Sequence, residues 1–295
     1  MPDDVPPPGS ARAADPNKPD LADAETLLAR LRARLEREER LLIAFSGGVD
    51  SALLAAAASS VLGERAVAVT AVSSSLPERE RRAALSFVRQ RAIRHLQVYT
   101  DELDRPEYVS NGGDRCFHCK SALFDALAPV AALTGSRIAL GTNLDDLGDH
   151  RPGQRAARER GAIFPLVDAG LGKNGVRAVS RLLCLETADK PAAACLSSRI
   201  AYGDPVTAEV LGRIERAEAA LHRRGFTECR VRAHANGSVA RLEIPAERLP
   251  DVHPVREAIV EEVRAAGFAF VALDLAGFRS GSMNVLLSRP QRRVR

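Results

Sequence analysis

Apolar positions along the chain alternate between two spacings, which predict alternating strands and helices. Continuous apolar runs predict buried strands over residues 41–45, 66–72, 96–99 and 137–140. Apolar residues at helical spacing, or alanine-rich stretches, predict helices over residues 21–38, 52–62, 78–91, 117–133 and 176–187. Strands that alternate with helices pair in parallel, so this part of the chain is expected to be α/β, a parallel sheet with helices on both faces.

The pattern changes near Pro191. Beyond it we expect helices over 207–224 and 254–266 and strands over 228–234, 238–244 and 268–274. Asn236-Gly237 lies between two of these strands and is a strong hairpin-turn signal. The sequence thus predicts one domain over 21–190 and a small C-terminal α+β domain over 191–295, suited to substrate capture or oligomer contact.

The first twenty residues contain six prolines and almost no apolar side chains, so residues 1–20 are predicted to be a disordered tail. No apolar stretch reaches the roughly 20 residues that span a bilayer, and the start of the chain does not resemble an export signal. We therefore expect no membrane partner and a cytoplasmic location. The net charge is +4 without a long basic run among aromatics, so nucleic acid is not the leading partner.

A glycine- and serine-rich turn, Ser46-Gly47-Gly48-Val49-Asp50-Ser51, joins the first strand to the alanine-rich helix. Glycines let the backbone approach an anion, and the amides at the start of the helix attract it, so the turn predicts a phosphate site. The acidic Asp50 is best explained by a Mg²⁺ ion on the pyrophosphate portion of a nucleotide. The kinase-type loop G-x-x-x-x-G-K-[ST] is absent.

This turn resembles the loop of the N-type ATP pyrophosphatases, or PP-loop enzymes, which have a Rossmann-like fold and cleave ATP between its α and β phosphates. Ligands of parallel sheets gather at the carboxyl ends of the strands, which adds the segments after the second and fourth strands to the site. An acidic, solvated helix start is the alternative for the segment after the fourth strand. The predicted ATP-binding residues are Ser46, Gly47, Gly48, Val49, Asp50, Ser51, Ser73, Gly141, Thr142 and Asp145.

The five cysteines are an odd number without an export signal, so structural disulfides are not expected. Cys116 and Cys119 form a C-x-x-C pair just before a helix, which suits zinc, an iron–sulfur cluster or a redox dithiol. A second such pair is missing, and Cys195 is the partner we choose, giving three thiolates and one open position. Cys184 and Cys229 are predicted to be ordinary apolar packing.

Four motifs together resemble the LarE family of ATP-dependent sulfur transferases, over roughly residues 21–280. They are the loop 46–51, the cysteine motif 115–120, the segment 141–146, and Lys190-Pro191 followed by 195–200. The resemblance implies that ATP adenylates a carboxylate of pyridinium-3,5-biscarboxylic acid mononucleotide. It further implies that a thiolate at Cys195 displaces AMP, and that the protein is a homo-oligomer.

The resemblance leaves two sources of sulfur. Some members lose the sulfur of the cysteine at the position of Cys195, which becomes dehydroalanine. A set of three cysteines resembles the members that hold a [4Fe–4S] cluster and pass sulfide catalytically. With Cys116, Cys119 and Cys195 all present, the cluster version is favoured, and Cys195 would then be a ligand that is not consumed.

Polar residues near Cys195 and on one later strand are the candidates for substrate binding. Two basic residues close to Cys195 are expected to lower the pKa of its thiol and hold the substrate's phosphate or second carboxylate. Two arginines that alternate on a strand face the same side, as an anion site or as a solvated face. The predicted substrate-binding residues are Lys190, Ser197, Ser198, Arg199, Arg230 and Arg232.

Two other functions compete. A tRNA thiolase shares the loop and can use three cysteines, but the small C-terminal domain and the lack of a basic, aromatic-bearing surface disfavour it. A nucleotide-binding sensor with a structural metal would not release AMP and pyrophosphate.

Overall fold

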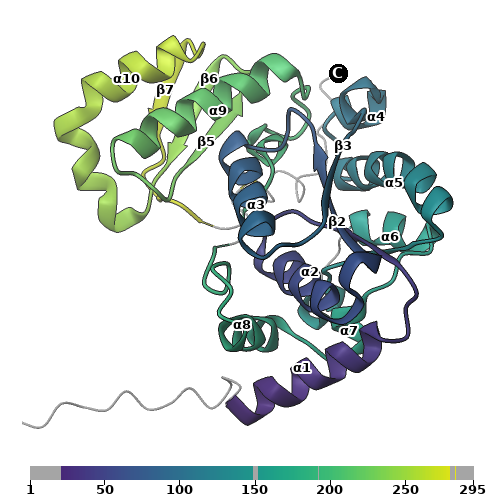
Figure 1. The fold of residues 1–295 in the computed structure, drawn as a ribbon. Coiled ribbons are helices and arrows are strands. Elements are labelled where there is room, and N and C mark those ends of the chain that lie inside the picture. Colours follow the sequence, from purple (N-terminus) through teal and green to yellow (C-terminus); the bar gives the residue numbers. More distant parts are fainter. Residues whose placement is uncertain (1–20, 149–151, 192, 280–282, 284–295) are drawn as a thin grey trace, which may run out of the picture.

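The computed structural model describes residues 21–148, 152–191, 193–279 and 283; the predicted tail 1–20 lies outside them. Two lobes are visible in Figure 1, each built on its own sheet. The helices are α1 (Leu21–Leu35), α2 (Val49–Leu62), α3 (Glu78–Gln90), α4 (Pro106–Val109), α5 (Arg115–Thr134), α6 (Pro152–Glu159), α7 (Pro165–Asp168), α8 (Lys173–Leu182), α9 (Ala208–Arg223) and α10 (Arg256–Ala265). The strands are β1 (Leu41–Ala44), β2 (Ala66–Val72), β3 (His95–Tyr99), β4 (Arg137–Leu140), β5 (Arg230–His234), β6 (Val239–Glu243) and β7 (Phe270–Leu273).

The first sheet has the order β3-β2-β1-β4 and all its pairings are parallel. β1 lies between β2 and β4, with Ile43 opposite Ala68 on one side and Ala139 on the other. The predicted α/β fold, a parallel sheet flanked by helices, is confirmed. The central position of β1 places the loop that follows it in the middle of the carboxyl edge of the sheet.

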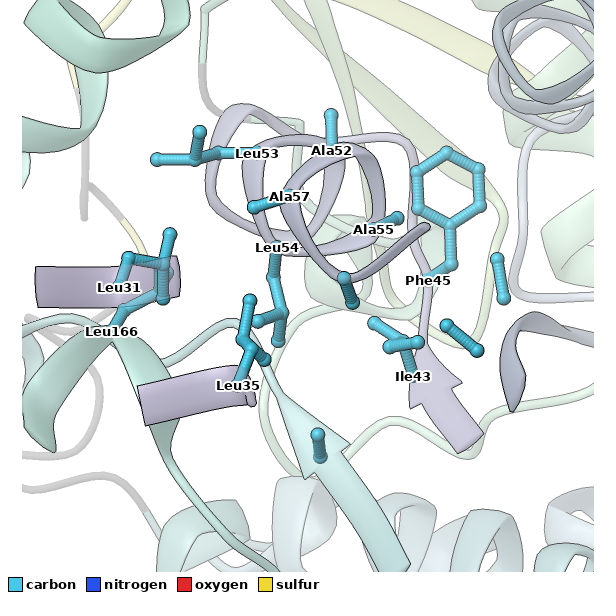
Figure 2. Packing of buried hydrophobic residues seen from close by; sticks show 14 of the residues in the cluster. Leu31, Leu35, Ile43, Phe45, Ala52, Leu53, Leu54, Ala55, Ala57 and Leu166 are labelled. Atoms are coloured by element: carbon cyan, nitrogen blue, oxygen red, sulfur yellow. The ribbon is translucent and has the colours of Figure 1, made fainter. Parts of the chain in front are cut away.

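The main core forms where the alanine-rich α2 packs between β1 and α1. Figure 2 shows α2 almost end-on, with Leu54 directed toward Leu35 of α1 and Ala55 toward Phe45 after β1. Small side chains on α2 let the helix approach the sheet closely, and Leu53 and Leu54 are fully buried. This packing holds the N-terminal end of α2 in place, and with it the loop of residues 46–51, which we call the phosphate loop.

The second sheet has the order β5-β6-β7, with β5 and β6 antiparallel and β6 and β7 parallel. The predicted hairpin turn is confirmed: Asn236 and Gly237 both have positive φ between β5 and β6. α9 and α10 cover this sheet, and its core also takes in Leu196 and the buried Tyr108 of α4. The division of the chain near residue 190 stays a prediction, because α4 contributes to both halves.

α5 is long and apolar enough, by length and composition alone, to cross a membrane. Such a helix is weak evidence for a membrane protein, because core helices of soluble proteins share the same composition. Here Leu123 and Leu127 pack against the residues of β1 and β2, and Phe124 packs beside Leu140 of β4. The first sheet therefore covers one face of α5, whereas Leu133 near the end of the helix is exposed.

Candidate functional site

The loop between β1 and α2 is closed on itself by two serines. Ser51 Oγ lies 3.1 Å from Ser46 Oγ, accepts from the Ser46 amide at 3.3 Å and donates to the Gly48 carbonyl at 3.1 Å. Gly47 has φ of +72°, a conformation that favours glycine. Gly48 is the N-cap of α2 and makes no side-chain cap, so the first amides of a 14-residue helix lie open at the loop.

Gly141 brings the segment after β4 against the start of α2. A Cβ on Gly141 would lie 2.7 Å from the Ser51 nitrogen and 2.9 Å from the Asp50 carbonyl carbon. The close approach lets Asn143 Nδ2 donate to Asp50 Oδ1 at 2.8 Å. Burial, followed by the nearby charge of Asp146, raises the pKa of Asp50.

Three other residues predicted to bind ATP, Ser73, Thr142 and Asp145, lie after β2 or β4 in different environments. Ser73 Oγ lies 2.8 Å from Ser75 Oγ after β2, and Thr142 is buried after β4. Asp145 Oδ2 accepts from the Lys173 amide at 2.6 Å, so this carboxylate caps the start of α8. Asp145 was the predicted nucleotide ligand of this segment, whereas Asp146 is the residue whose charge acts on Asp50.

Lys190 lies at the phosphate loop. Its Nζ donates to the Gly47 carbonyl at 2.9 Å and pairs with Glu80 Oε2 of α3 at 2.7 Å. Arg177 of α8 holds the preceding turn by donating to the carbonyls of Ala188 and Lys190, at 2.7 and 3.2 Å. Glu80 and Arg177 were not predicted to belong to the site, because their local sequence gives no sign of the contacts that they make. Asn143 lies in the predicted segment 141–146, but its bond to Asp50 was not predicted.

Cys195 is exposed and directly precedes a short 3₁₀ helix, Leu196–Arg199. The Leu196 amide donates to the Ser75 carbonyl at 2.9 Å, which places the cysteine segment beside the loop after β2. Ser197 is fully buried, and its Oγ lies 2.6 Å from the hydroxyl of Tyr108. The exposed thiol therefore stands on a well-anchored segment next to the carboxyl edge of the first sheet.

Burial, followed by the charge of Cys195, raises the pKa of the Cys119 thiol to about 12. Because the charge of Cys195 acts on this thiol, the two cysteines lie near each other. Cys116 is exposed and lies three residues earlier on the same helix, where side chains share a face. Within the described residues, no group of three or more His, Cys, Asp or Glu side chains is close enough to hold a metal ion. Assembly of the three thiols around a cluster stays a prediction.

The arginines near Cys195 lie in a mostly buried charge network. Arg199 is buried and pairs with Glu218 at 3.0 Å, and it also donates to the carbonyls of Ala194 and Cys195, at 2.6 and 3.0 Å. These contacts orient the backbone of the cysteine segment rather than its thiol.

The two arginines predicted on one strand belong to β5. Arg232 pairs with the buried Glu243 at 2.8 Å and donates to the Ser198 carbonyl at 3.0 Å. Ser198 Oγ in turn donates to the Cys195 carbonyl at 2.7 Å. Burial, followed by the positive charge of Arg199, lowers the pKa of Arg230. An anionic substrate group near Arg230 would relieve this repulsion between positive charges.

The phosphate loop fits the nucleotide that the resemblance implies. Open amides and a positive helix end suit the phosphates, and glycine at 47 and 48 leaves room for their close approach. Asp50 would hold Mg²⁺, because Mg²⁺ is commonly bound by one or two carboxylates together with substrate phosphates. Burial is the main cause of the raised pKa of Asp50, and the charge of Asp146 adds to it; a cation beside Asp50 would offset both effects.

No protein-family model matches the chain, but known proteins are similar to it over most of its length. An uncharacterised protein of Synechocystis sp. is 44% identical over 268 residues, which are 90% of this chain and 99% of that protein. An uncharacterised protein of Methanocaldococcus jannaschii is 26% identical over 245 residues, 83% of this chain and 92% of that protein.

A relative with a named activity extends over nearly the whole of both chains. The pyridinium-3,5-bisthiocarboxylic acid mononucleotide synthase of Lactiplantibacillus plantarum is 34% identical over 273 residues, 92% of this chain and 98% of that enzyme. Together with the parallel sheet and the loop after β1, this similarity confirms the family inferred from the motifs. The chain belongs to the LarE family of ATP-dependent sulfur transferases, within the PP-loop ATP pyrophosphatases.

Proposed function

We propose that the enzyme uses ATP to adenylate a carboxylate of pyridinium-3,5-biscarboxylic acid mononucleotide and converts it to a thiocarboxylate. The sulfur comes either through Cys195 itself or from a [4Fe–4S] cluster that Cys116, Cys119 and Cys195 would hold. The observation that carries this proposal is the place of Cys195. Its segment is tied on one side to the Ser75 carbonyl beside the phosphate loop, and on the other side to Arg232 of β5. An exposed thiol between a nucleotide site and a cluster of arginines suits an anionic acyl substrate.

The first step activates the carboxylate. A carboxylate oxygen attacks the α-phosphorus of ATP, pyrophosphate leaves, and the acyl adenylate forms. The amides at the start of α2 stabilise the charge that develops on pyrophosphate, and Asp50 would hold the Mg²⁺ ion that neutralises it when bound. The carbonyl carbon then carries AMP as a good leaving group.

The second step brings in sulfur. The Cys195 thiolate attacks the acyl carbon, AMP leaves with the former carboxylate oxygen, and a thioester joins substrate and protein. In the sacrificial route the Cβ–Sγ bond of Cys195 then breaks as its α proton is removed. The sulfur stays on the product as a thiocarboxylate, and dehydroalanine remains in the chain.

The alternative route spares the cysteine. A [4Fe–4S] cluster held by Cys116, Cys119 and Cys195 would leave one iron open to bind an added sulfide. The nearness of Cys119 to Cys195, and the position of Cys116 one helical turn before Cys119, support this route. The three side chains would have to draw together to share one cluster.

We also propose the roles of the two domains, the oligomeric state, the location in the cell and the class of substrate. Residues 21–190 would form the ATP pyrophosphatase domain and 191–295 the domain that captures substrate, in a homo-oligomer located in the cytoplasm. A small-molecule nucleotide rather than tRNA is the favoured substrate, because the synthase at 34% identity is named for a mononucleotide product.

Intact mass measured before and after turnover tests the proposal, using protein purified without oxygen, with iron and acid-labile sulfide determined in parallel. Reactions contain ATP, Mg²⁺ and the biscarboxylated pyridinium nucleotide. Thiolated product with loss of H₂S from Cys195 supports the sacrificial route, and thiolated product with an unchanged mass and a bound cluster supports the other. Absence of AMP would refute the proposed function in either form.

A further inference from the structure

A largely buried ion pair between Glu80 and Lys190 lies directly beside the phosphate loop. Glu80 and Ala84 are four residues apart on α3 and therefore share one face of the helix. That face packs on the loop, since a Cβ on Gly47 would lie 3.1 Å from the Ala84 Cβ. The carboxylate of Glu80 is thus held next to a site built for anions, where an acid is unfavourable unless a cation accompanies it.

Lys190 supplies that cation. Its Nζ lies 2.7 Å from Glu80 Oε2, and the two side chains are only 21% and 20% exposed. Glu80 Oε2 makes no hydrogen bond within the described part of the chain, so the positive charge of Lys190 is what stabilises this carboxylate oxygen there. Lys190 has three N–H donors, and one of them is donated to the Gly47 carbonyl at 2.9 Å.

We propose that Lys190 binds the β- and γ-phosphates of ATP, and that Glu80 is a built-in counter-ion which competes with them for the Lys190 ammonium. This inference rests on the proposed binding of ATP at the loop. Polyphosphate would take over the ammonium from Glu80, while the Gly47 carbonyl keeps Nζ at the loop. Glu80 would thereby weaken binding of the pyrophosphate portion and favour its release after adenylation.

The proposal predicts different effects on the affinities for ATP and pyrophosphate than on the affinity for AMP. AMP lacks the groups that Lys190 would contact, so removal of the ammonium should change affinity for ATP and pyrophosphate but not for AMP. A neutral residue in place of Glu80 removes both a competitor and a repulsive charge, so pyrophosphate should bind more tightly. A merely structural role for the pair predicts that either change weakens all three ligands together.

Isothermal titration with ATP, AMP and inorganic pyrophosphate tests this in the full chain. We expect Lys190→Met to weaken ATP and pyrophosphate by about tenfold or more, with AMP within about twofold of wild type. Glu80→Gln should tighten pyrophosphate by about threefold or more. Lys190→Arg, which keeps the charge, should retain most of the affinity.

Glu78→Gln is the matched control, because Glu78 is on the same helix and pairs with Arg81 and Arg82 away from the loop. It should leave all three affinities unchanged. Equal loss of AMP and ATP affinity in Lys190→Met, or weaker pyrophosphate binding in Glu80→Gln, would overturn the proposal. Failure of the wild-type chain to bind ATP or AMP at all would overturn the proposed function as well, which distinguishes the two.

Discussion

Substitution of Gly141 by alanine should disable the site more than it destabilises the fold. The added Cβ would lie 2.7 Å from the Ser51 nitrogen and 2.9 Å from the Ser51 Cα, and all three nearest atoms belong to the backbone. Non-bonded heavy atoms prefer separations near 3.5 Å, so the start of α2 must move by roughly 0.8 Å. Overpacking of this kind costs about 1–3 kcal/mol of unfolding free energy.

The displaced backbone is the part of the loop that we propose to bind phosphate, so the effect on catalysis should be larger. A misplacement of about 1 Å in a catalytic group can cost on the order of 100-fold in rate. We therefore expect kcat/KM for substrate-dependent AMP formation to fall about 100-fold, while urea denaturation shows the modest loss above.

Gly212→Ala on α9 is the control, because the nearest atom to its Cβ is the far end of the flexible Arg216 side chain, at 3.1 Å, and not backbone. This variant should keep the activity of the wild-type protein and at least its stability, because alanine favours a helix over glycine by up to about 1 kcal/mol. A Gly141→Ala enzyme with kcat/KM within about twofold of wild type would refute the claim that the approach of β4 to α2 shapes the nucleotide site.

Three further predictions concern buried charges and thiols. Arg199→Met leaves a buried carboxylate without its partner, so urea denaturation should show a loss of about 3–5 kcal/mol, against almost none for the exposed Arg256→Met; equal losses would contradict this. Burial lowers the pKa of His95, so its folded form resists protonation; stability should fall as pH drops below about 6.5, and His95→Gln should flatten that part of a urea-midpoint profile. Iodoacetamide followed by peptide mapping should label Cys184 rapidly and Cys229 slowly, because Cys184 is exposed whereas burial raises the pKa of Cys229 to about 12; comparable rates would contradict the burial difference.

Most of the regular structure could be predicted from the chain because it depends on local patterns. The apolar run 66–72 is β2 with the same bounds, and the Asn236-Gly237 signal is the turn between β5 and β6. The short helices α6 and α7 were not predicted, because stretches of eight and four residues are shorter than the roughly 11 residues over which helical periodicity can be recognised. α8 starts three residues before the predicted Val176, where Asp145 caps Lys173 from a distant part of the chain.

The candidate site could be predicted only in part, for the same physical reason. The loop after β1 has its own signature of glycine and serine, whereas Asn143 acts through Asp50, which lies 93 residues earlier. Arg199 was predicted from its charge to bind an anion, but its carboxylate partner is 19 residues away on α9. Packing of Cys184 was a wrong prediction: the residue lies in the turn after α8, with positive φ, and is exposed, while Cys229 is buried as predicted.

The central claim is that activation at the phosphate loop is coupled to sulfur transfer at Cys195, and the Cys195→Ser enzyme tests it most directly. AMP and thiocarboxylate are quantified together in anaerobic reactions of wild-type and variant protein with ATP, Mg²⁺ and the biscarboxylated pyridinium nucleotide. The account predicts that wild type forms both products, whereas the variant still forms acyl adenylate or AMP but no thiocarboxylate. Thiocarboxylate from the variant at the wild-type rate would contradict the account.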